Sequence, residues 1–148
     1  MELTTEKIQK IVYNYFGQTI AEADENKKNQ EQEYVQPRQI SMYFAKQLTN
    51  DSLSKIGRVN GEKDHATALH SVRVVNNLID TDKKFRQTIF DLENFIEKER
   101  EKMYKESRED VLLRIKELEE KLSYYKKLLE EIEQKEVYDY DVAQLGHA

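Results

Sequence analysis

The sequence LSKIGRVNGEKDHATAL, residues 53–69, decides the fold. Its first seven residues are long enough for two helical turns, with Leu53, Ile56 and Val59 facing inward. Asn60-Gly61 is a turn signal, and a longer helix is expected to begin at about Asp64. A short helix, a tight turn and a longer helix together predict a helix-turn-helix arrangement.

Two further helices are expected before this stretch. The first is capped by Thr4 or Thr5, ends at Gly17, and carries an apolar face at helical spacing: Ile8, Ile11, Val12, Tyr15 and Phe16. Residues 18–36 contain a polar run without apolar period, which predicts a surface loop. Pro37 is expected to open the next helix, since its missing N–H costs nothing in a first turn. The buried stripe of that helix is Ile40, Tyr43, Phe44 and Leu48.

Beyond residue 80 the sequence predicts a long helix and a coiled coil. Residues 98–110 hold ten charged side chains in thirteen, which indicates a solvated connector. Apolar residues then recur at alternating spacings of four and three, a strong coiled-coil signal: Val111, Ile115, Leu118, Leu122, Tyr125, Leu129 and Ile132. We therefore expect a domain over 1–80, a charged helical connector over 81–110, a coiled coil over 111–135, and an acidic flexible tail over 136–148. A dimer, an intramolecular hairpin and a helical partner all remain open for the coil.

The composition is that of an all-α protein. The 148 residues include only 4 Gly and 1 Pro, and they contain no Cys, which excludes disulfides and thiolate metal sites and suits the cytoplasm. No apolar run approaches the roughly 20 residues that span a bilayer, and the acidic N-terminus is unlike a secretory signal. The net charge is −5, but residues 34–78 carry six basic and three acidic side chains, a local +3.

The sequence gives no indication of catalysis, and we expect a protein that is not an enzyme and needs no cofactor. The abundant carboxylates of residues 97–136 fit a solvated helix face rather than paired catalytic acids. His65 and His70 diverge on a helix and have no Cys nearby, so no metal is expected. No Gly-x-x-x-x-Gly-Lys-Ser/Thr loop for nucleotide phosphates occurs.

Three blocks carry a resemblance to a known family: PRQISMY at 37–43, LTNDSLSKIG at 48–57 and GEKDHATALH at 61–70. In type and spacing they resemble the C-terminal DNA-binding domain of DnaA, the bacterial chromosomal replication initiator. The resemblance covers about residues 3–80 and leaves out the family's nucleotide-binding module. It implies sequence-specific binding of double-stranded DNA, connected with replication initiation or its regulation.

The resemblance also implies which residues touch DNA. Asp64, His65 and Thr67 would begin a recognition helix that reads base edges in the major groove, and Arg38 would enter the adjacent minor groove. Phosphate contacts are expected of Leu53, Ser54, Lys55, Lys63 and Arg73, and His70 is expected at a phosphate or a base. Ala66 is also counted among the DNA-binding residues.

Several positions depart from the family's pattern. Ala66 stands where Thr is usual, and Ser54 stands where Pro is usual. The loop before Pro37, usually rich in Arg and Lys, reads NQEQE at residues 29–33 and keeps only Lys27 and Lys28. Fewer phosphate contacts predict weaker binding that depends less on salt. Two alternatives follow: an interaction protein that uses the domain as a scaffold for its coil, and a transcriptional regulator of a mobile element.

Overall fold

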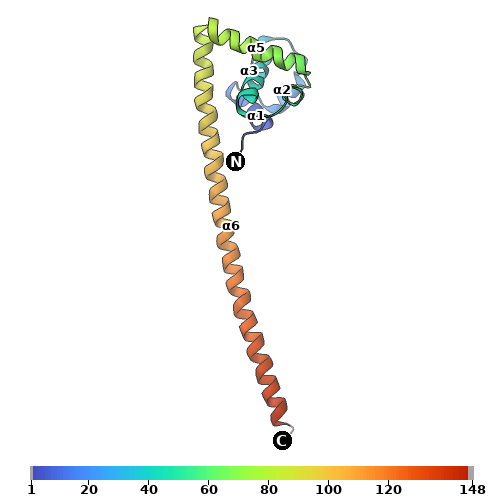
Figure 1. Cartoon of the computed structure of the whole chain (residues 1–148), viewed down its shortest axis with the longest axis vertical. Coiled ribbons are helices and arrows are strands. Elements are labelled where there is room, and N and C mark those ends of the chain that lie inside the picture. Colours follow the sequence, from blue (N-terminus) through green and yellow to red (C-terminus); the bar gives the residue numbers. More distant parts are fainter. Residues whose placement is uncertain (1, 147–148) are drawn as a thin grey trace. The chain divides into compact units, whose positions relative to one another are not determined.

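The computed structural model describes residues 2–146 and consists of six helices, with no strand among these residues. The prediction of an all-α protein is confirmed. The helices, labelled in Figure 1, are α1 (Thr5–Tyr15), α2 (Ile20–Glu25), α3 (Gln32–Leu48), α4 (Leu53–Val59), α5 (His65–Thr81) and α6 (Lys83–Leu145). The chain divides into two compact units, the first ending at Tyr104 and the second beginning at Lys105.

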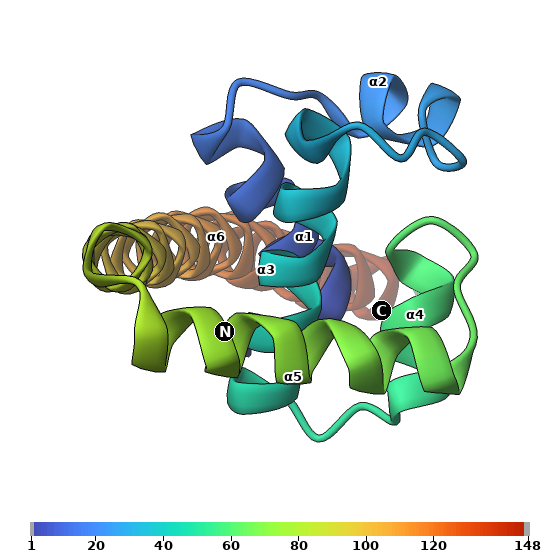
Figure 2. The same cartoon turned by 90° about the horizontal axis from the view of Figure 1, so that it is seen from above.

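The first unit is built around α3, which packs against both α1 and α5. Figure 2 shows α5 crossing over α3, with α4 beside the first turns of α5. A small apolar cluster joins α3, α4 and α5 through Met42, Ala45, Ile56 and Ala68, with Leu53 packed against it. This cluster fixes α4 and α5 as the helix-turn-helix that the sequence predicted.

Residues 18–36 differ from the surface loop that we expected. They contain α2, which begins with a capping box: the Thr19 hydroxyl accepts from the N–H of Glu22, and the Glu22 carboxylate accepts from the N–H of Thr19. They also contain the start of α3. The expectation of a loop was wrong because a reciprocal cap can hold a helix of six residues whose side chains are not buried.

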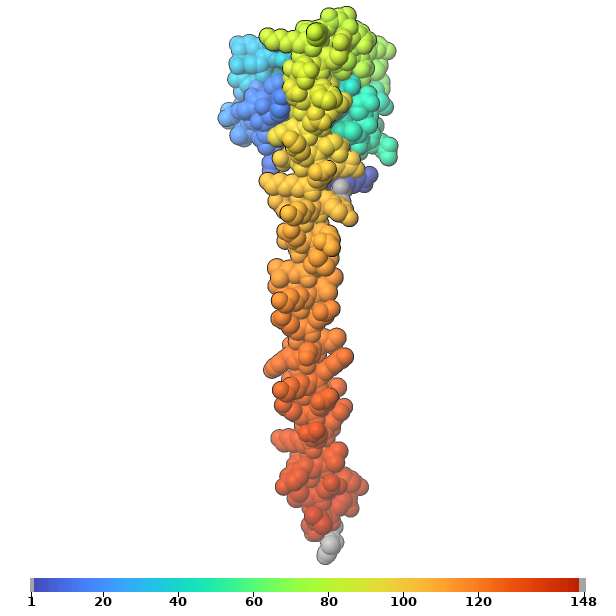
Figure 3. Space-filling view, turned by 90° about the vertical axis from the view of Figure 1, so that its left-hand side faces the viewer, coloured from blue at the N-terminus to red at the C-terminus, as the bar shows by residue number. Residues whose placement is uncertain are grey.

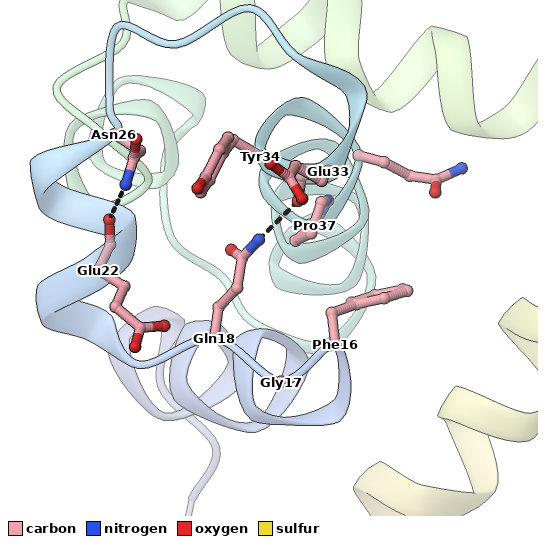
Figure 4. Close-up of a pocket in the computed structure, with 9 residues that line it drawn as sticks. Phe16, Gly17, Gln18, Glu22, Asn26, Glu33, Tyr34 and Pro37 are labelled. Carbon is pink, nitrogen blue, oxygen red and sulfur yellow. Dashed lines mark hydrogen bonds between the residues drawn. The ribbon is translucent and has the colours of Figure 1, made fainter.

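Pro37 lies inside α3 rather than at its opening, which corrects our prediction of the helix start. A proline has no N–H, so the carbonyl of Glu33, four residues earlier, loses its helical partner. The Gln18 side chain replaces that partner, because its Nε2 donates to the Glu33 oxygen at 2.6 Å (Figure 4). A side chain fifteen residues earlier in the sequence thus lets the helix run through the proline.

The first part of α6 belongs to the core of the first unit. Phe85, Ile89, Leu92 and Ile96 are buried in one cluster with residues of α1, α3 and α5. We expected the domain to end near residue 80 and residues 81–110 to form a connector; in the structure the compact unit continues to Tyr104. The apolar stripe of residues 85–96 therefore serves as the last core element of the domain.

The second unit consists of the remaining part of α6. The helix reaches Leu145, so most of the acidic tail expected to be flexible is helical, and no turn interrupts residues 83–145 to form a hairpin. Every residue from 108 to 146 is exposed, including the apolar ones; they are the orange and red residues in Figure 3. Among residues 2–146, no helix is both long enough and apolar enough to cross a membrane.

Candidate nucleic-acid interface

Side-chain caps define where α4 and α5 begin. The Ser52 hydroxyl accepts from the N–H of Lys55 at 3.1 Å, and the Asp64 carboxylate accepts from the N–H of Thr67 at 2.8 Å. The bond from Thr67 holds the pKa of Asp64 below its usual range, with a smaller contribution from His65. Asp64 therefore keeps a negative charge at the positive end of the α5 dipole, where it stabilises the helix.

Gly57 sets the tightness of the turn between the two helices. A Cβ atom at this position would lie 2.5 Å from the carbonyl oxygen of Lys63 and 2.9 Å from that of Asp64. The N–H of Lys63 donates to the Gly57 oxygen at 2.8 Å across the same contact. The backbone that leads into α5 therefore passes directly over α4, at a distance that only glycine permits.

The first turn of α5 presents its side chains to solvent. His65, Ala66 and Thr67 are exposed, as are His70 and Arg73 further along the helix. The opposite face is buried and fastens the helix to the core through Ala68, Ser71, Val72 and Val75. The helix thus has a free face at its N-terminal end, where the resemblance placed the residues that read DNA.

Arg38 is held inside the domain in this structure. Its side chain is 6% exposed, and its guanidinium donates to the backbone oxygens of Asn26 at 3.0 Å and Asn29 at 2.8 Å. Lys63 binds the same loop, since its Nζ donates to the oxygen of Lys27 at 2.8 Å. Burial lowers the pKa of Arg38 and that of Lys63, and the neighbouring positive charges of Arg38 and Lys28 lower the latter further.

Four of the predicted residues line one open hollow of about 200 Å³ between α3 and α5: Arg38, Lys63, Thr67 and His70. Gln39 lines it too and was not among the predicted residues, although it directly follows the Pro-Arg pair. Its amide can donate and accept, which suits a base edge or a phosphate.

The predicted residues of α4 are less free than those of α5. Leu53 is partly buried against the small cluster, whereas Ser54 is exposed. Lys55 is engaged with two carboxylates: its Nζ lies 3.3 Å from Asp51 and 3.8 Å from Glu6. Exposed ion pairs of this kind are weak, so a phosphate can compete for the lysine.

Comparison with known proteins places this arrangement in a family. Residues 5–75 match the family described as "Bacterial dnaA protein helix-turn-helix". Residues 5–75 form a DnaA helix-turn-helix domain. The match includes α1 to α4 and the part of α5 that carries the exposed first turn.

Individual relatives agree with the DnaA assignment. Chromosomal replication initiator protein DnaA from Wolbachia pipientis wMel is 45% identical over 87 residues, which are 59% of this chain and 18% of the relative. The corresponding proteins of Lactobacillus helveticus and Flavobacterium psychrophilum are 41% identical over 95 residues and 42% over 91; the matched parts cover 64% and 62% of this chain and 20% and 19% of the relatives. The matched region thus spans about a fifth of the length of these DnaA relatives.

Proposed function

We propose that the DnaA domain of this chain binds double-stranded DNA at initiator-box-like sites, with the first turn of α5 in the major groove. The observation that carries the proposal is the exposure of His65, Ala66 and Thr67 on a helix whose other face is anchored in the core. A Thr methyl can pack on a thymine methyl, and an imidazole can bond to a base edge. The free N–H groups of the helix start suit a neighbouring phosphate.

Phosphate contacts are proposed for the basic residues around this turn. Lys28 and Arg73 are exposed. To bind a phosphate, Lys55 needs to leave only its weak ion pairs, and Lys63 needs to leave only its hydrogen bond to the Lys27 oxygen. The loop supplies only two lysines, so few counterions are released on binding. We expect a correspondingly small salt dependence, with the log–log slope changing by roughly 0.9 for each phosphate contact.

Minor-groove entry by Arg38 is proposed as an induced step. The guanidinium must first release the Asn26 and Asn29 carbonyls, so the 26–30 loop has to rearrange when DNA binds. The minor groove would then supply acceptors in place of the two carbonyls, at a narrow place where negative potential is strong. Without DNA, Arg38 instead holds the loop in position.

The test compares binding of the full chain to a duplex with the initiator box and to a scrambled duplex. The variant His65→Ala/Thr67→Ala removes two proposed base contacts, and Asn76→Ala/Asn77→Ala is the matched control, since these residues are also exposed on α5. Each base contact is worth about 1–3 kcal/mol, so the first variant should bind the box at least roughly ten-fold more weakly. The control should bind like the original chain. Equal affinity of the original chain for both duplexes would refute sequence-specific binding.

A scaffold function is the second candidate, and the state of Arg38 favours it. In this structure the residue expected in the minor groove is buried, and the loop beside it carries Glu31 and Glu33. If His65→Ala/Thr67→Ala leaves the biological activity unchanged, the domain acts as a support for its coil rather than as a DNA reader.

In either case, we propose that the seam of residues 111–132 pairs with another helix. A complex with two DNA-binding domains would gain avidity on paired boxes. By binding DNA in this way, the protein would compete for initiator boxes and so act in replication initiation or its regulation.

A further inference from the structure

The second unit carries an apolar seam whose partner the geometry identifies. The seam residues are between 46% and 61% exposed although all are apolar or aromatic: Val111, Ile115, Leu118, Leu122, Tyr125, Leu129 and Ile132. At 1.5 Å per residue they form a stripe of roughly 33 Å on one side of α6. A helix on its own leaves this surface in water, whereas a second helix with the same spacing of apolar residues would cover it.

Charges at the ends of the seam argue against a parallel pair of two copies. In a parallel pair, each core residue faces itself, so Arg108, Glu136 and Asp139 would each meet their own like charge at the layers just beyond the seam. At the positions that flank the core, Lys121 of one copy would also repel Lys126 of the other. A single flanking attraction, between Arg114 and Glu119, opposes these repulsions.

An antiparallel pair centred between Ser123 and Tyr124 removes most of these conflicts. The core layers then join Ile115 to Ile132, Leu118 to Leu129 and Leu122 to Tyr125 of the other copy, each layer occurring twice by symmetry. Apolar residues thus meet apolar residues in every layer from Ile115 to Ile132, whereas Val111 at each end of the seam faces Glu136 of the other copy.

The same alignment pairs opposite charges. Arg108 meets Asp139 of the other copy just beyond the seam, and Glu119 flanks the seam opposite Lys126. One like-charged flanking pair, Arg114 with Lys135, is left.

We propose that residues 108–139 form an antiparallel coiled coil with a second copy of this chain. The proposal rests on the helical pairing proposed above, commits that pairing to a second copy, and does not depend on DNA binding. Because the interface is isologous, two copies satisfy it and no open chain of subunits follows.

The first experiment measures the size of the full chain by sedimentation velocity without DNA, for three proteins. The original chain should be a dimer at micromolar concentration. Leu118→Gln places a polar amide in the seam and should shift the chain to a monomer. Leu113→Gln is the matched control: Leu113 is exposed to a similar degree but lies on the opposite side of the helix, so this variant should remain a dimer. A monomeric original chain, a trimer or tetramer, or equal effects of the two substitutions would overturn the proposal.

The second experiment tests orientation, using the absence of Cys from the sequence. Ile115→Cys and Ile132→Cys, each mixed with itself and oxidised mildly, should form little disulfide, because each residue lies far from its own copy. A mixture of the two variants, allowed to exchange subunits, should form a covalent dimer. Disulfides within each single variant, and none that joins the two variants in the mixture, would establish a parallel pair and overturn the proposal.

A charge exchange provides an independent check. Lys126→Glu should weaken the dimer roughly five-fold or more, because it faces Glu119, and Glu119→Lys/Lys126→Glu should restore it. In a parallel pair, Lys126→Glu would instead strengthen the dimer by relieving the contact with Lys121. Circular dichroism of each variant verifies that α6 keeps its helix content. Because DNA is absent from all of these measurements, their failure is distinguishable from a failure of DNA binding.

Discussion

Replacing Gly57 by alanine should disrupt the helix-turn-helix at its tightest point. The added Cβ atom would lie 2.5 Å from the Lys63 oxygen and 2.9 Å from the Asp64 oxygen, whereas ordinary van der Waals contact begins at about 3.4 Å. Both atoms are backbone, so no side chain can rotate away. The segment that leads into α5 must move, and the bond from the Lys63 N–H to the Gly57 oxygen is strained with it.

The expected loss of stability follows from opposing contributions. Alanine within a helix is favoured over glycine by about 1 kcal/mol. Overpacking against a fixed backbone costs about 1–3 kcal/mol, and weakening the Lys63 bond costs about 1 kcal/mol more. We therefore expect Gly57→Ala to lower the free energy of unfolding by about 1–3 kcal/mol. In a domain of this size, each kcal/mol lowers Tm by roughly 4–8 °C.

Scanning calorimetry and duplex binding by the full chain together test this reasoning. Gly17→Ala is the control: Gly17 has φ +77°, but a Cβ atom there meets nothing within 4 Å. It should cost about 1 kcal/mol through backbone strain and leave DNA binding intact. Gly57→Ala should in addition weaken duplex binding at temperatures where the domain is folded, because the start of α5 is displaced. A Tm equal to or above that of the original chain would refute the argument.

Three further contacts of the first unit can be tested by substitution. Burial raises the pKa of Tyr13 to about 12 from its usual 10, so the folded state favours the protonated phenol. Its contribution to the free energy of unfolding should be fully present below pH 10 and should fall by up to about 3 kcal/mol toward pH 12. Tyr13→Phe should flatten this loss in urea titrations. An unchanged slope would contradict the assignment. Gln18→Ala should cost about 0.5–1.5 kcal/mol because it removes the hydrogen bond to the Glu33 oxygen, and adding Pro37→Ala, which restores a helical N–H, should recover most of the loss in thermal melts. Asp64→Ala should lower Tm through loss of the cap. In the original chain the depressed pKa of Asp64 means that its contribution is present above the usual carboxyl range and is lost as pH falls below it, whereas Asp64→Asn should show less of this acid dependence.

Features that depend on neighbours in sequence were predictable. The caps at Ser52 and Asp64 and the turn at Asn60-Gly61 follow from side chains that bond within three residues or from backbone freedom. The capping box of Thr19 and Glu22 has the same local character, and the Thr-x-x-Glu pattern could have revealed α2. The exposed face of α5 follows in turn from helical periodicity once the helix start is known.

Features that depend on distant partners were not predictable from the local pattern. A proline in the sixth position of a helix leaves the Glu33 carbonyl without its helical partner, and Gln18, distant in the sequence, supplies another. The sequence predicted that Arg38 would be free to contact DNA. In the structure its guanidinium donates to two loop carbonyls, and the sequence pattern did not indicate that these lie next to it. The same holds for the stripe of residues 85–96, whose periodicity predicts a helix but does not say what covers it.

The sequence by itself determined the all-α class, the helix-turn-helix and the heptad seam, because each rests on periodicity and on bonds between residues close in the chain. Only the tertiary structure decided that the domain reaches into α6, that Pro37 lies within a helix, and that Arg38 is held by the 26–30 loop. The physical reason is that burial and hydrogen-bond satisfaction depend on which segments meet in space. The sequence shows which apolar side chains must be buried and which polar groups need a hydrogen bond, but the fold determines which residues bury or bind them.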